Sequence, residues 1–268
     1  MLSNQYTPAV ASEAAFSAPS RPTLVFLHGF LGDGREWQTV IEQLSEYSCL
    51  TIDMCRHGRS AYRECQGFED ACSMILDTIV QRVGTDTPVI LVGYSLGARI
   101  AMYGLVKQLW QGINLIGVVS EGGNLGIRDE KFRAQRLESD LGWARRFSLE
   151  PIEQVLNDWY RQPIFSGLKH AQRQELVAFR SDNLGVCVAE MLIATSLGKQ
   201  PYLLDELKQQ SLPIHYICGE KDSKFSQLAQ ESGLPYTQIA QAGHNVHKEQ
   251  PEAFADCLRE FIATCSKV

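Results

Sequence analysis

A serine stands between two glycines in Gly93-Tyr94-Ser95-Leu96-Gly97, after an apolar run over residues 88–92 and before a helical stretch over 98–110. This order is typical of a nucleophile elbow, a sharp strand-to-helix turn that lifts its serine above a sheet. A Cβ at either glycine would obstruct the turn. The first N–H groups of the helix lack intrahelical partners, so they could hold an oxyanion. The sequence therefore predicts a reactive serine at position 95.

Partners for this serine follow in the order Ser, Asp, His. Asp222 comes after the apolar run 214–218 and a short turn, and His244 lies in Ala242-Gly243-His244-Asn245. In such a triad His244 takes the proton of Ser95, while Asp222 fixes the imidazole tautomer and stabilises the imidazolium. An isolated Asp after a strand is more often a turn former or helix cap, and an isolated loop His is more often a bystander. Their joint occurrence favours a triad.

Other histidines offer competing interpretations. His247 lies three residues after His244 and could act as the base instead, although the glycine before His244 suits a tight loop better. His28 ends an apolar strand and His57 lies in a glycine-containing loop. We expect both to anchor loops rather than to transfer protons.

A second oxyanion donor is expected near the first strand. Residues 23–27 form an apolar run, and His28-Gly29-Phe30 follows it where folds with this elbow supply a further N–H. The predicted oxyanion donors are the backbone amides of Phe30 and Leu96.

Composition limits the class of protein. The chain has 268 residues, of which 44% are hydrophobic and 21% charged, with a net charge of −6. This suits one α/β domain with an insertion and argues against a broad nucleic-acid surface, and the longest apolar runs are too short to span a bilayer. Eight cysteines occur singly, without paired metal-ligand spacing, so we expect reduced thiols and a cytoplasmic protein. The sequence does not determine the oligomeric state.

Apolar strands alternate with helical segments along most of the chain, which predicts a mostly parallel sheet covered by helices. The expected strands are 23–28, 47–53, 88–93, 113–120, 213–219 and 235–240, and the expected helices are 67–83, 95–110, 222–233 and 251–265. Residues 1–20 are expected to form a flexible leader. Residues 21–123 and 205–268 form the predicted core, and 124–204, where the alternation fails, form a predicted helical cap.

The predicted cap is rich in arginine, with Arg133, Arg136, Arg145, Arg146, Arg161, Arg173 and Arg180. Arg99 lies one helical turn after Ser95, where a buried cation without an anionic partner would be unfavourable. Guanidinium groups bind carboxylates bidentately, so these residues favour a small polycarboxylate substrate. Most arginines on such a helical cap nevertheless only cover its surface.

Several strings together resemble the MenH family of the α/β-hydrolase fold superfamily, from about residue 22 to the end of the chain. They are Gly93-Tyr94-Ser95-Leu96-Gly97-Ala98-Arg99, Glu121-Gly122-Gly123, Asp158-Trp159-Tyr160 and residues 176–181, 218–225 and 242–247. Esterases in general share the elbow but not the whole set. Ala98 departs from an expected glycine, and Cys55-Arg56 replaces a common Pro-Gly.

The resemblance implies a lyase of menaquinone biosynthesis, without metal or organic cofactor. Such an enzyme eliminates pyruvate from 2-succinyl-5-enolpyruvyl-6-hydroxy-3-cyclohexene-1-carboxylate to give 2-succinyl-6-hydroxy-2,4-cyclohexadiene-1-carboxylate. By resemblance, the triad falls on Ser95, Asp222 and His244, and the substrate-binding positions fall on Tyr94, Arg99, Arg136, Trp159 and Arg180. The alternatives are a serine carboxylesterase or carbon–carbon bond hydrolase acting on a small carboxylated substrate, and a non-catalytic binding protein with the same fold.

Overall fold

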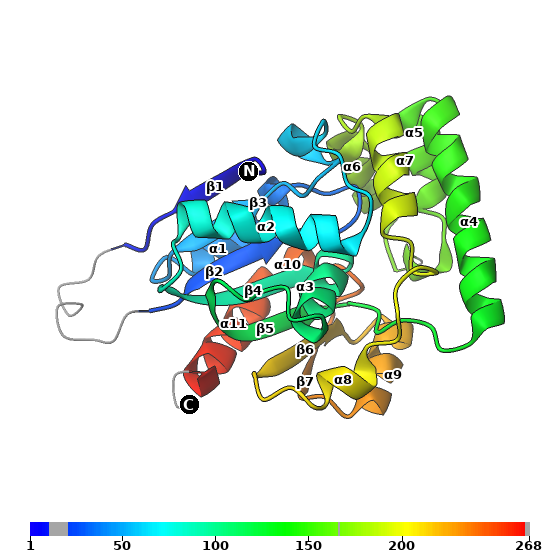
Figure 1. Ribbon diagram of the computed structural model, residues 1–268. Coiled ribbons are helices and arrows are strands. Elements are labelled where there is room, and N and C mark those ends of the chain that lie inside the picture. Colours follow the sequence, from blue (N-terminus) through cyan, green and yellow to red (C-terminus); the bar gives the residue numbers. More distant parts are fainter. Residues whose placement is uncertain (11–20, 166, 266–268) are drawn as a thin grey trace.

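The centre of the molecule is a sheet of mostly parallel strands (Figure 1). The computed structural model describes residues 1–10, 21–165 and 167–265. Within them the strands lie across the sheet in the order β1 (Asn4–Thr7), β3 (Cys49–Ile52), β2 (Thr23–Leu27), β4 (Pro88–Tyr94), β5 (Asn114–Glu121), β6 (Ile214–Gly219) and β7 (Tyr236–Ile239). β1 runs antiparallel to β3, and the other neighbouring strands are parallel. The carboxyl ends of β2, β4, β5, β6 and β7 therefore meet at one edge of the sheet.

Helices cover both faces of the sheet because successive strand residues point to opposite sides. Val25 and Leu27 pack in a cluster with α2 (Phe68–Arg82), α3 (Leu96–Val106) and α8 (Leu204–Leu207). Leu24 and Phe26 pack on the other face with α1 (Gln38–Gln43), α10 (Val246–Glu249) and α11 (Pro251–Cys265). The expected α/β fold with a mostly parallel, helix-covered sheet is confirmed.

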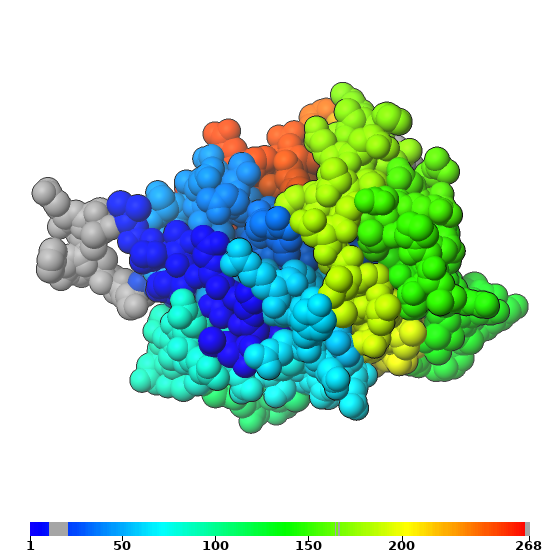
Figure 2. Space-filling model, turned by 90° about the horizontal axis from the view of Figure 1, so that it is seen from above, coloured from blue at the N-terminus to red at the C-terminus, as the bar shows by residue number. Residues whose placement is uncertain are grey.

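The α-helices that the structure describes between β5 and α8 gather beside the core, on the right in Figures 1 and 2. They are α4 (Glu130–Leu149), α5 (Ile152–Trp159), α6 (His170–Arg180) and α7 (Gly185–Ala194). These helices pack around their own cluster of buried residues, which also includes Leu31 from the loop after β2. We call this group the cap and keep 124–204 as its proposed boundaries.

The remaining helical elements connect these layers. α9 (Ser223–Ser232) follows β6, and the 3-10 helices within the described residues are η2 (Gly34–Trp37), η3 (Gly58–Ser60) and η4 (Pro163–Phe165). Within the residues that the structure describes, no helix is both long and apolar enough to cross a membrane.

The expected flexible leader over residues 1–20 is wrong at its start. Residues 4–7 form β1, which pairs with β3, and Leu2 is buried in the core. Backbone hydrogen bonds hold this polar edge strand, so it shows no apolar pattern in the sequence. The rest of the predicted leader, residues 11–20, lies outside the described residues.

The helix predictions also need correction. α1, α8 and α10 were not expected, and α3 ends at Val106 rather than at 110. The chain reverses at Gln108, where φ is 56°. Trp110 then packs back on α3 and donates from Nε1 to the carbonyl of Ala101 (3.0 Å).

Candidate active site

Ser95 occupies a strained turn between β4 and α3, with φ 48° and ψ −103°. Its N–H donates to the carbonyl of Glu121 on the neighbouring strand (2.8 Å). Both glycines of the elbow are sterically required. A Cβ on Gly93 would lie 2.4 Å from the amide nitrogen of Ala98, and a Cβ on Gly97 would lie 2.2 Å from the carbonyl oxygen of Leu27. Backbone packing on both sides therefore fixes the position of the serine.

Asp222 and His244 meet at the ends of β6 and β7. Oδ2 of Asp222 lies 2.7 Å from Nδ1 of His244, and both side chains are buried. The other carboxylate oxygen caps α9 by accepting from the N–H of Phe225 (3.3 Å). The ring of Phe225 packs against the imidazole, with 4.7 Å between centroids. Nδ1 of His244 is thus engaged by the carboxylate, which leaves Nε2 as the nitrogen for proton transfer.

Gly122 makes room for this imidazole. It has φ 57°, and a Cβ there would lie 2.9 Å from Cε1 of His244. In the string Glu121-Gly122-Gly123 at the end of β5, Gly122 therefore leaves the space that the imidazole of His244 occupies.

Ser95 and His244 line one cavity of about 360 Å³ between core and cap. Within the described part of the chain, no hydrogen bond joins Ser95 to His244. Such contacts often form only when the substrate is bound. The geometry thus brings the three predicted triad residues to one place, with the Asp222–His244 contact already made.

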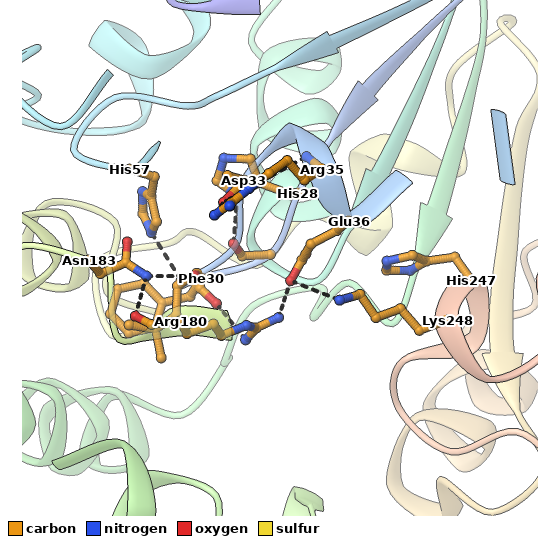
Figure 3. A network of polar contacts seen from close by, with 12 residues as sticks. His28, Phe30, Asp33, Arg35, Glu36, His57, Arg180, Asn183, His247 and Lys248 are labelled. Atoms are coloured by element: carbon orange, nitrogen blue, oxygen red, sulfur yellow. Dashed lines mark hydrogen bonds and ion pairs between the residues drawn. The ribbon is translucent and has the colours of Figure 1, made fainter. Parts of the chain in front are cut away.

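The predicted oxyanion donors, Phe30 and Leu96, line the same cavity. Leu96 is the first residue of α3, where a helix has an amide without an intrahelical partner. The Phe30 loop is held from two sides. Arg180 donates from Nη1 to the Phe30 carbonyl (3.2 Å), and the N–H of Leu31 donates to Nε2 of His57 (3.0 Å; Figure 3). Both contacts fix the Phe30–Leu31 peptide, which directly follows the peptide that would present the Phe30 N–H.

His28 and His57 hold loops, as expected. Nε2 of His28 accepts from the N–H of Met54 (2.9 Å), and its Nδ1 lies 2.7 Å from the Gly29 carbonyl. Nδ1 of His57 lies 3.0 Å from the Cys55 carbonyl. Burial lowers the pKa of His57 to about 3. A neutral ring accounts for its accepting role.

Arg180 reaches the cavity from α6 but is bound to an acid of the core. It forms a buried ion pair with Glu36 (Figure 3) and donates from Nη1 to Oη of Tyr160 (2.6 Å). Nζ of Lys248 also lies 4.0 Å from Glu36. Burial raises the pKa of Glu36, but Arg180 and Lys248 outweigh this effect and the pKa lies below its usual value. The charge of Arg180 is thus already compensated.

Arg136 is paired as well. Its Nε donates to Oδ1 of Asp140 one turn along α4 (2.8 Å), and Oδ2 of Asp140 accepts from the hydroxyl of Ser196 (2.7 Å). Both Arg136 and Asp140 line the Ser95 cavity.

Arg99 differs from these two arginines. Its Nε donates to Oε1 of Gln200 and its Nη2 to the carbonyl of Thr195, both at 2.6 Å, and both acceptors are neutral. Burial and the charge of Arg136 lower the pKa of Arg99 from its usual value. Among the described residues no carboxylate forms an ion pair with Arg99, so its charge remains available to an anion in the cavity.

The comparisons with known proteins identify the family of the chain. Residues 24–257 match the model of the alpha/beta hydrolase family. The chain is 45% identical to 2-succinyl-6-hydroxy-2,4-cyclohexadiene-1-carboxylate synthase of Yersinia enterocolitica, over 91% of this chain and 88% of the relative. It is 46% identical to the protein of the same name from Serratia proteamaculans, over 90% and 93% of the two chains. The solved structure of MenH from S. aureus superposes with a TM-score of 0.86, at 26% identity, over 99% of this chain and 100% of that one. The chain belongs to the MenH family of the α/β-hydrolases.

The fold extends to more distant relatives. A thermophilic esterase from Thermogutta terrifontis has a TM-score of 0.78 at 16% identity, over 98% of this chain and 93% of the esterase. At this identity the likeness concerns the fold alone.

One departure from the expected MenH pattern has a structural explanation. Arg56 stands where a glycine is common and adopts φ 64°, a conformation that favours glycine. Its guanidinium forms an ion pair with Glu190 on α7. The arginine thus connects the loop after β3 to the cap, a contact that glycine cannot make.

Tyr94 and Trp159, the aromatic positions expected from MenH proteins, both line the cavity. Trp159 contacts Phe30 and Trp143, with ring centroids 5.3 and 5.1 Å apart. The sequence prediction missed Asp140, Trp143, Phe165 and Lys224 among the lining residues. A signal for two of them exists, because Arg136, Asp140 and Trp143 are spaced by four and three residues and share one face of α4.

Other candidates lie outside this cavity. Of the described cap arginines, Arg133, Arg145, Arg146, Arg161 and Arg173 do not line it, and Arg133, Arg146 and Arg161 form ion pairs with neighbouring acids. His247, the alternative base, is buried with its Nδ1 2.7 Å from Glu121 and its ring stacked on Trp37. This environment favours a structural role for His247.

Proposed function

We propose that this chain eliminates pyruvate from 2-succinyl-5-enolpyruvyl-6-hydroxy-3-cyclohexene-1-carboxylate to give 2-succinyl-6-hydroxy-2,4-cyclohexadiene-1-carboxylate, in menaquinone biosynthesis. The substrate carries three carboxylates. The observation that carries the proposal is a cavity lined by both Ser95 and Arg99, in which Arg99 has only neutral acceptors. Arg136 and Arg180 also line it, and Asp140 is the carboxylate among the described lining residues. An anionic substrate fits this charge distribution, whereas a neutral lipid ester does not.

In the first step Ser95 acts as a base. Its hydroxyl gives its proton to Nε2 of His244, and its oxygen removes a proton from the substrate ring. Asp222 stabilises the imidazolium through Nδ1. The electron pair of the broken C–H bond moves toward the succinyl carbonyl, whose oxygen receives hydrogen bonds from the amides of Phe30 and Leu96.

In the second step the electron pair returns to form a double bond between C2 and C3 of the ring. The existing C3–C4 double bond moves to C4–C5, and the bond from C5 to the enolpyruvyl oxygen breaks. The leaving enolate takes up the proton held by the His244 imidazolium and becomes pyruvate, which returns His244 to its neutral form while the ring gains conjugation. This route involves neither an acyl-serine nor a hydrolytic water. The aromatic side chains of Trp143, Trp159 and Phe165 around the cavity therefore help by excluding solvent.

Ser95→Ala tests the role of the serine. Pyruvate release is measured with purified protein and the cyclohexene substrate, together with substrate binding. We expect turnover to fall by roughly a thousandfold, within the usual range for loss of a general base, with binding largely retained. Pyruvate release by the variant at the parent rate would refute the serine mechanism.

The same assay separates the lyase from a serine hydrolase. A carboxylesterase or carbon–carbon bond hydrolase would form an acyl-serine or activate a water and would tolerate Arg99→Ala. The lyase should lose affinity in Arg99→Ala and should accumulate no acyl-enzyme with an ester substrate. Mass spectrometry of the intact protein after mixing detects the acyl adduct.

We also propose a cytoplasmic location. All eight cysteines are buried free thiols, as expected for a reducing compartment.

A further inference from the structure

The cations of the Ser95 cavity fall into two groups when their partners are considered. Arg180 is paired with Glu36, and Arg136 is paired with Asp140. Arg99 is bound by neutral acceptors. The fourth cation that lines the cavity is Lys224, which was absent from the predicted site.

Lys224 is placed by the same turn that positions the triad carboxylate. It is the second residue of α9, directly after the Asp222 cap. The next residue, Phe225, binds Asp222 through its N–H and packs its ring on His244. Nζ of Lys224 lies 5.4 Å from the centroid of that ring. The location of Lys224 relative to His244 is thus set by the contacts that hold the triad.

No acid neutralises Lys224 at close range. Within the described chain it forms no ion pair, and the nearby carboxylate of Asp222 is already engaged by His244 and the amide of Phe225. Lys224 is exposed as a residue, but the protein around its ammonium group partly desolvates it. This desolvation and the charge of Arg136 lower the pKa of Lys224, while Asp222 opposes the shift. An anion in the cavity would relieve the repulsion between Lys224 and Arg136.

We propose that Lys224 binds one carboxylate of the substrate while Arg99 binds another. This inference rests on the proposed lyase function. Arg99 projects from α3 and Lys224 from α9, so the two charges approach the cavity from different elements. The two cations without acidic partners would then hold a polycarboxylate at two points, which fixes its orientation relative to Ser95.

The test compares Lys224→Gln with Lys224→Arg and with Lys221→Gln. Lys221 lies three residues earlier in the same turn, does not line the Ser95 cavity, and donates from Nζ to the Gln241 carbonyl (3.0 Å). For Lys224→Gln we expect KM for the cyclohexene substrate to rise about tenfold with kcat within about twofold of the parent, as for loss of a charge-assisted hydrogen bond at the rim of a site. Lys224→Arg should restore most of the affinity, and Lys221→Gln should match the parent.

An unchanged KM in Lys224→Gln, or an equal rise in Lys221→Gln, would overturn the assignment. Isothermal titration with succinate supplies a readout that does not depend on turnover. We expect Lys224→Gln to bind succinate about tenfold more weakly than the parent. If the parent releases no pyruvate, the proposed lyase function is wrong, and the titration alone tests whether Lys224 binds a carboxylate. Weaker binding by the variant supports the assignment, and equal or absent binding in both proteins contradicts it.

Discussion

The carboxyl edge of the sheet and the cap hold their functional residues in different ways. At the sheet edge the backbone fixes position. Ser95 sits in a turn packed so closely that its flanking glycines have no room for a Cβ, and Asp222 caps a helix. In the cap, charged side chains are held by other side chains, as Arg136 is by Asp140 and Arg180 by Glu36.

Lining the cavity therefore does not by itself show that the charge of a cation is available to a substrate. Arg180 lines the cavity, yet its charge serves to connect α6 to Glu36 and to the Phe30 loop. Arg99 lies on the core helix after Ser95 and meets only neutral acceptors. Pairing therefore distinguishes Arg136 and Arg180, which each bind an acid of the chain, from Arg99, which binds neutral acceptors.

The largest effect should come from filling the elbow. In Gly97→Ala the new methyl group would lie 2.2 Å from the Leu27 carbonyl oxygen, so the backbone must shift. We expect a loss of about 3 kcal/mol in the free energy of unfolding from overpacking and a fall of at least about a hundredfold in turnover from displacement of Ser95. Urea unfolding and pyruvate release measure the two. Parent-like activity would show that the elbow is more adaptable than its packing indicates.

The second prediction concerns the pair that joins cap and core. Glu36→Gln leaves the buried charge of Arg180 without its acid, and Lys248 loses the same neighbour. We expect the free energy of unfolding to fall by about 3 kcal/mol, as for breaking a buried ion pair. Urea unfolding measures the change.

A double variant provides the control for that pair. Replacing both charges, in Glu36→Met with Arg180→Met, should cost less than the sum of the single changes because no buried charge is left alone. Additive losses would mean that the two side chains act independently.

The smallest change in the free energy of unfolding is expected in the cap, at a glycine that, unlike Gly97, has room for a Cβ. Gly142 is exposed within α4, and a Cβ there would meet no atom within 4 Å. Gly142→Ala should raise the free energy of unfolding by up to about 1 kcal/mol through helix propensity, without changing pyruvate release. A thermal melt and the pyruvate assay check both. Destabilisation would indicate that α4 needs flexibility at this position.

The sequence predicted those parts of the fold that depend on local patterns. The limits predicted for β2, β4 and α11 from their apolar patterns lie within one residue of the observed limits. β1 escaped prediction because its residues are polar and its pairing with β3 joins segments more than forty residues apart. Lys224 was overlooked because nothing in its neighbouring residues distinguishes a lysine that faces a cavity from one that faces solvent.

The amino-acid sequence alone indicated the chemistry. The elbow, the downstream acid and the downstream imidazole are local motifs, and each has steric and electronic requirements that can be recognised separately. Only the folded molecule decided which cations are free. Glu36 lies 144 residues from Arg180, and the neutral acceptors of Arg99 lie 96 and 101 residues away from it. Charge compensation depends on distance in space, and that distance is set by how the cap packs on the core.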